Sequence, residues 1–309
     1  MQKLSKNLKV WLYASFILAG LAAILLTVAL FTDYDSSSGY FKTSIIYSIF
    51  KGMCIVVCGL AVVTVLTTPK GALNGDSPLS APIVFPSAFL ALVFFCGGMI
   101  LLGALLGLSI VCDTFTGVAT ADPALLGVGA LFSFGSVVYF ILNCFPKDGK
   151  LSERHALFGF SVPIAAAIYL SISYFDLSVS INAPIKLMTQ LALIFSMLWM
   201  LYELRVPLKK PMPRLYFAFG ILALFFSGTA SLPYLIGGAA NLIKSTVFPT
   251  YYLYVFVSLA MFCYIAVRLT VYVLARDIFE RIADQTPIEI FAEEESEDPD
   301  AAEDPSVEN

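Results

Sequence analysis

One stretch of the chain, residues 182–203, concentrates the side chains that could bind a polar molecule. On an α-helix its polar residues fall on or beside a single face. They are Asn182, Lys186, Thr189, Gln190, Ser196 and Glu203. Ionisable groups and amides are costly in lipid, so this face should turn toward other helices or toward water.

A second polar stripe, in residues 44–66, places another lysine about as far below the outer surface as the first. Together the two stripes give a candidate binding site for a small anionic or zwitterionic molecule. Its residues are Lys51, Asn182, Lys186 and Gln190. The site would face residues 225–238, whose Gly, Ser and Pro predict an interrupted helix with loosened backbone. Alternatively, both lysines extend to the lipid headgroups and line no cavity.

On the inner side, Glu203 and Arg268 are predicted to lie at the same depth in different helices, with Asn143 close in level. Because an unpaired charge in a membrane is costly, we expect Glu203 to pair with Arg268. Such a pair would act either as a structural clamp between helices or as a gate or proton-linked site. The sequence leaves both roles open.

Residues typical of catalytic or metal centres are scarce. His155 is the only histidine, and it is expected at the cytoplasmic end of a helix, with no second histidine for zinc or haem. No phosphate-binding or dinucleotide-binding glycine motif occurs. The six cysteines lie in or beside apolar runs without zinc spacing, so we interpret them as packing residues. We therefore expect no enzymatic activity, no metal and no cofactor.

The elements that must position these residues are membrane helices. The chain is 59% hydrophobic and only 13% charged, whereas soluble domains carry about 25% charged residues. Apolar runs long enough to cross a bilayer predict an all-α bundle of eight transmembrane helices with short loops. Their approximate bounds are 10–31, 44–66, 86–111, 124–145, 156–175, 182–203, 215–236 and 249–275. Gly103 and Gly107 form a GxxxG pair, which we interpret as close packing within the chain.

The distribution of basic residues predicts the orientation of the bundle. With the N-terminus inside, 14 of the 18 Lys and Arg fall on the inner side, as cytoplasmic loops require. The four exceptions are Lys42, Lys51, Lys186 and Lys244. We therefore expect a plasma-membrane protein with both termini in the cytoplasm.

Residues 282–309 differ in composition from the transmembrane domain, residues 1–281. They hold 11 of the 22 Asp and Glu and none of the Lys or Arg. We expect a disordered, acidic cytoplasmic tail, which could bind a basic cytoplasmic protein. No feature of the chain indicates a nucleic-acid partner.

Two functions fit these observations. The favoured one is a transporter-like or small-ligand-binding membrane protein, with its polar site in the outer half between helices 44–66, 182–203 and 215–236. The alternative is a non-catalytic membrane scaffold or sensor subunit that acts through its acidic tail and basic loops.

Overall fold

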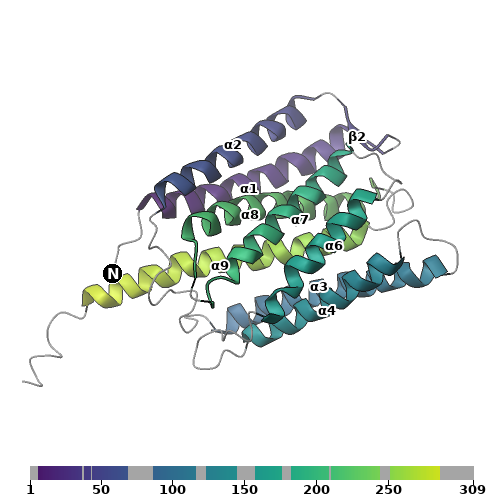
Figure 1. Cartoon of the computed structure of the whole chain (residues 1–309). Helices are drawn as coiled ribbons and strands as arrows, with labels where there is room; N and C mark the ends of the chain where they lie inside the picture. Colours follow the sequence, from purple (N-terminus) through teal and green to yellow (C-terminus); the bar gives the residue numbers. More distant parts are fainter. Residues whose placement is uncertain are drawn as a thin grey trace, which may run out of the picture.

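The computed structural model is a bundle of long helices that run along a common direction (Figure 1). It describes residues 6–36, 38–42, 44–68, 86–115, 123–144, 157–175, 182–208, 210–243 and 251–285. The helices are α1 (Lys6–Thr32), α2 (Ile45–Thr67), α3 (Pro86–Phe115), α4 (Pro123–Cys144), α6 (Ser161–Phe175), α7 (Pro184–Glu203), α8 (Pro213–Ala239) and α9 (Tyr251–Gln285). Each overlaps one of the predicted ranges. A short antiparallel hairpin, β1 (Tyr34–Asp35) and β2 (Tyr40–Phe41), lies between α1 and α2.

The described helices are long and apolar enough for a multi-pass membrane protein. Seven of them have the length and hydropathy needed to cross a bilayer, and the described part of α3 adds a shorter apolar segment, Phe95–Leu108. Large apolar side chains cover the outside of the bundle. Ile45, Ile55 and Leu66 of α2 are each at least 74% exposed, which suits lipid and not water. The exact number of spans, eight, stays a prediction.

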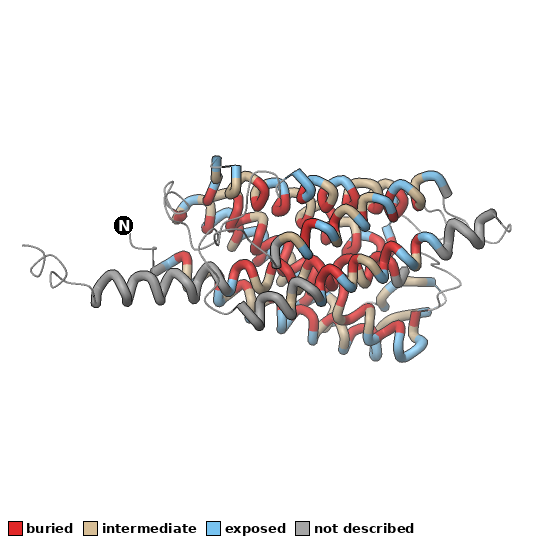
Figure 2. Tube along the Cα trace, turned by 90° about the horizontal axis from the view of Figure 1, so that it is seen from below, coloured by how far each residue is buried: buried red, intermediate tan, exposed pale blue. Residues whose placement is uncertain are grey.

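Helix α8 lies at the centre of the molecule. It packs against α1, α2, α7 and α9, and most of its residues are buried. Buried residues gather in the interior of the bundle (Figure 2). Helices α1 and α2 contact each other and α8. The remaining helices form a ring in which α3 contacts α4, α4 contacts α6, α6 contacts α7, and α9 contacts α3 and α7. The core therefore surrounds α8, with this ring on one side and α1 and α2 contributing the rest.

The predicted interruption in residues 225–238 is wrong, because α8 is one continuous helix that includes Pro233. The hydroxyls of Thr229 and Ser231 donate to carbonyl oxygens one turn back, at 3.0 and 2.6 Å, which keeps these polar groups satisfied inside the helix. A Cβ at Gly228 would lie only 2.9 Å from a phenyl ring of α9. The small residues therefore permit close helix packing and do not loosen the backbone.

Helix α3 approaches α9 through its glycines. A Cβ at Gly103 would lie 3.3 Å from side-chain atoms of both Leu253 and Val257, and Gly107 also faces Leu253. The GxxxG pair thus packs within the chain, as predicted.

Helix α9 extends past its predicted membrane span. It continues to Gln285, beyond the expected end near 275, so residues 282–285 are helical although the sequence places them in the tail. The rest of the predicted tail and the loop that contains His155 lie outside the described residues.

Candidate functional site

The inward face of α7 carries a line of buried polar groups. Lys186, Thr189, Ser196 and Glu203 are each only 1–2% exposed, so the predicted inward orientation of this face is confirmed. The helix begins at Pro184, a residue suited to the first turn because its missing N–H needs no partner there. Since α7 packs against α6 and α8 and also touches α9, these groups lie among helices and not in lipid.

At the inner end of this line, Glu203 forms an ion pair with Arg268 of α9. Arg268 Nε donates to Glu203 Oε1 at 2.7 Å, and Arg268 Nη2 lies 2.5 Å from the same oxygen. Both residues are buried. Asn143, the third residue predicted here, lies in the last turn of α4, and its side chain is outside the described part of the chain. The ion pair thus joins α7 to α9.

Aromatic rings surround this ion pair. The Tyr264 hydroxyl donates to Glu203 Oε1 at 3.5 Å. The ring of Trp199, one turn earlier on α7, lies 5.7 Å from the rings of both Tyr216 and Tyr264. Glu203 Oε2 is buried and accepts no hydrogen bond from a described residue. The two donors of Arg268 therefore leave one carboxylate oxygen available in an enclosed, mainly aromatic setting.

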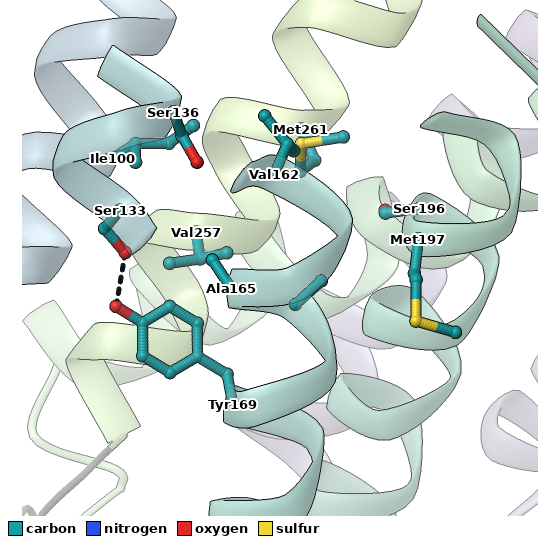
Figure 3. Close-up of a pocket in the computed structure, with 11 residues that line it drawn as sticks. Ile100, Ser133, Ser136, Val162, Ala165, Tyr169, Ser196, Met197, Val257 and Met261 are labelled. Carbon is teal, nitrogen blue, oxygen red and sulfur yellow. Dashed lines mark hydrogen bonds between the residues drawn. The ribbon is translucent and has the colours of Figure 1, made fainter. Parts of the chain in front are cut away.

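A small cavity lies beside Ser196 of α7, which is seven residues before Glu203 and about 10 Å from it along the helix. It is lined by residues of α3, α4, α6, α7 and α9, is partly open, and has a volume of about 20 Å³ (Figure 3). Ser133 of α4 and Tyr169 of α6 form a hydroxyl–hydroxyl hydrogen bond of 2.5 Å at its wall. Ser196, which also lines it, is 2.9 Å from the hydroxyl of Ser227 on α8. The cavity is thus lined by four residues with hydroxyl groups, Ser133, Ser136, Tyr169 and Ser196, among mostly apolar side chains.

The predicted outer site is not assembled as expected. Lys51 is exposed on α2, where its ammonium group lies 4.8 Å from the centre of the Tyr47 ring. Helix α2 packs on α1 and α8, and its contact with α7 is marginal at most. Lys186, by contrast, is buried and interacts with another group of the protein. Lys51 therefore lies on the surface of α2, whereas Lys186 lies inside the bundle.

The two amide residues of the predicted site also lie in different places. Asn182 is exposed and precedes α7. Gln190 is half-buried one turn after Lys186, and its Nε2 donates to Ser173 Oγ of α6 at 3.5 Å. Of the four predicted residues, only Lys186 and Gln190 thus lie next to each other inside the bundle.

Sequence reasoning did not identify the hydroxyl-lined cavity. Its signal is present in α4, where Gly129, Ser133 and Ser136 share one helical face. Tyr169 of α6 gives no such signal, because tyrosine is common in membrane helices as an interfacial residue. Only the packing of α4 on α6 brings its hydroxyl to Ser133.

Comparisons of the chain with protein-family models, with curated proteins and with solved structures gave no match. Among the described residues, no group of three or more His, Cys, Asp or Glu is arranged to hold a metal ion. The buried polar groups among the described residues are hydroxyls, one lysine and the Glu203–Arg268 ion pair.

Proposed function

We propose that the protein is a transporter-like membrane protein that binds a small anionic or zwitterionic solute within the bundle, beside the inward face of α7. The observation that carries the proposal is the row of four polar residues on that face, all at most 2% exposed. Buried polar and ionisable groups in membrane helices are costly and typically mark solute or ion pathways.

In this proposal Lys186 supplies the positive charge that attracts the solute, and Gln190 supplies an amide beside it. Both lie in the first two turns of α7, near the predicted outer surface. The Glu203–Arg268 pair lies 17 residues farther along α7 than Lys186, about 25 Å away at 1.5 Å per residue. The pair would close the inner end of the path while the solute is at Lys186. Lys51 has no role here, because it is exposed on α2.

A ligand-dependent thermal shift tests the proposal with a matched pair of lysine variants. Purified protein in detergent is melted alone and with amino acids, dicarboxylates or neutral polyols, and the midpoint is followed by tryptophan fluorescence. A charged solute that binds the folded bundle should raise the midpoint. Lys186→Met should abolish that rise, whereas Lys51→Met should preserve it.

The Lys51→Met variant controls for the loss of a positive charge as such. The melting midpoints of both variants without solute report any direct effect on stability. If no anionic or zwitterionic solute shifts the midpoint of the wild-type protein, or if the two variants lose the shift equally, the proposed site is wrong.

The absence of enzymatic activity is part of the same proposal. The scaffold or sensor alternative depends on the acidic tail and on basic loops that lie mostly outside the described residues. No described contact favours it. The location in the plasma membrane and the cytoplasmic position of both termini remain predictions.

A further inference from the structure

Two cysteines from different helices meet where α3 packs on α9. The thiol groups of Cys96 on α3 and Cys263 on α9 are hydrogen-bonded to each other, and both thiols are free. Cys96 is completely buried, whereas Cys263 is partly exposed. Two touching thiols can form a covalent bond with each other, which a single packed cysteine cannot do.

The contact between the two cysteines belongs to an antiparallel seam between the helices. A Cβ at Gly107 would meet the side chain of Leu253, and one at Gly103 would also meet Val257. Moving back four residues on α3 thus corresponds to moving forward four residues on α9. Continuing in this register for seven more residues brings the two cysteines to within one residue of direct opposition. The packing of the two helices therefore supports the contact between the thiols.

Small residues bring the backbones of α3 and α9 close together at this seam. A Cβ at Gly103 would lie only 3.8 Å from the backbone carbonyl oxygen of Leu253. A disulfide needs its two Cα atoms about 4.4–6.8 Å apart, and helices approach this closely where the residues between them are small. Cysteine is itself a small residue. The seam therefore favours a bond between the two sulfurs without a large movement of either helix.

We propose that Cys96 and Cys263 are a modification site for hydroperoxides, at which the two thiols form a reversible disulfide that joins α3 to α9. In the first step Cys263, the more exposed thiol, attacks one oxygen of the peroxide. The O–O bond breaks, Cys263 becomes a sulfenic acid, and the other oxygen leaves with the thiol proton as water or an alcohol. When Cys96 donates in the hydrogen bond between the thiols, it stabilises the negative charge that develops on the attacking sulfur.

In the second step the sulfur of Cys96 attacks the sulfur of the sulfenic acid. The S–S bond forms, the S–O bond breaks, and the hydroxyl group leaves with the proton of Cys96 as water. Two thiols and one hydroperoxide thus give one disulfide, one water and one alcohol, or two waters when the oxidant is hydrogen peroxide. The two sulfurs are oxidised and the peroxide oxygens are reduced.

The bond would change how the bundle is held together. The main contacts of α3 are with α4 and α9, and α3 and α4 lie side by side at one edge of the molecule (Figure 1). Arg268 follows Cys263 by five residues on α9. Thiols and disulfides are both uncharged, so neither state places a charge among the apolar side chains of the seam. Oxidation would therefore fix the α3–α4 pair to the helix that carries the ion pair.

Thiol counting and peptide mapping test the site in the purified full-length protein. Reduced protein in detergent is treated with hydrogen peroxide or tert-butyl hydroperoxide, and the remaining thiols are labelled with a maleimide after denaturation. The wild-type protein should lose two of its six thiols, and dithiothreitol should restore both. Mass spectrometry after digestion with pepsin should find the peptides of Cys96 and Cys263 joined. The oxidised protein should also melt at a higher temperature, because the bond constrains the unfolded chain.

Single variants test the order of the two steps. In Cys96→Ser the sulfenic acid on Cys263 has no partner and should be trapped by dimedone. In Cys263→Ser the buried Cys96 should give several-fold less of this adduct. The matched control is Cys54→Ser/Cys58→Ser, which removes two thiols of α2 and should leave the cross-link unchanged.

Thermal melting identifies any variant that fails to fold, and the peptide map of the wild-type protein depends on no variant. Free thiols at both Cys96 and Cys263 after peroxide treatment, or a disulfide between other cysteines only, would overturn the proposal. Trapping of Cys96 and not of Cys263 would overturn the order of attack. None of these results depends on whether a solute binds near Lys186.

Discussion

Glu203 receives two donors of Arg268 on a single oxygen, inside a setting from which water is excluded. Removing two charges from water is costly, and their attraction compensates for this only when the geometry is good. The two residues come from helices that are far apart in the sequence. The pair therefore makes the position of α7 dependent on that of α9.

A double-mutant cycle tests this coupling. Glu203→Gln or Arg268→Met alone leaves one buried charge without its partner, and either should lower the free energy of unfolding by about 3–5 kcal/mol. The double variant should be more stable than the sum of the two losses implies. The measurement is unfolding in mixed micelles at increasing SDS.

A second cycle that combines Arg268→Met with Lys51→Met is the control, because Lys51 lies exposed on α2. Those two changes should be additive. Additive losses in the Glu203–Arg268 cycle would contradict a stabilising clamp.

The residues of the site differ in how far the sequence could reveal them. Pairing of Glu203 with Arg268 follows from their depth and from the cost of an unpaired charge. The separation of Lys51 from Lys186 does not follow, because depth and helical face do not tell which helices are neighbours. Helix α2 packs on α1 and α8. Which helices become its neighbours depends on how well many apolar side chains fit together.

Among the elements, α8 shows how the same residues act differently in water and in a membrane bundle. Gly, Ser, Thr and Pro favour turns in soluble proteins because their backbone and side chains can bond to water. Inside the bundle the hydroxyls bond to their own helix, and the absence of large side chains allows neighbours to approach. Positions of the helices could thus be predicted from apolar run length, whereas the continuity of α8 depends on what surrounds it.

Packing of α4 against α6 can be tested with two glycines of the same helix. A Cβ at Gly129 would lie 2.7 Å from Tyr169 Cε1, so Gly129→Ala must displace that ring and should cost about 1–3 kcal/mol of stability. At Gly127 no atom lies within 4 Å of the added Cβ. Gly127→Ala should therefore be neutral or slightly stabilising. Melting midpoints of the two variants give the comparison, and equal effects would contradict the close approach of α4 and α6.

For the whole molecule, segments that the sequence predicts to be cytoplasmic lie at the same end of the bundle. The end of α2 and the start of α8, each predicted to be cytoplasmic, are in contact, since Arg214 Nε donates to the carbonyl oxygen of Thr68 at 2.9 Å. Helix α1 also begins at the end of the bundle where α9 finishes (Figure 1). This arrangement suits an even number of spans.

Reporter fusions test the predicted topology. A reporter after Asn309 or within residues 146–155 should be active in the cytoplasm, and one within residues 176–182 should be active outside, because 14 of the 18 basic residues fall on the predicted inner side. An external C-terminus would mean an odd number of spans.

The length of α9 has a mechanical consequence. Its 35 residues span about 52 Å at 1.5 Å per residue, whereas the hydrocarbon core of a bilayer is about 30 Å thick. A single helix therefore runs from Gln285, at the end predicted to be cytoplasmic, to Val257 at the cavity wall, with Arg268 between them. Any force that tilts or rotates the end of this helix at Gln285 moves Arg268 relative to Glu203. The helix thus connects the end predicted to be cytoplasmic to the ion pair inside the bundle without an intervening loop.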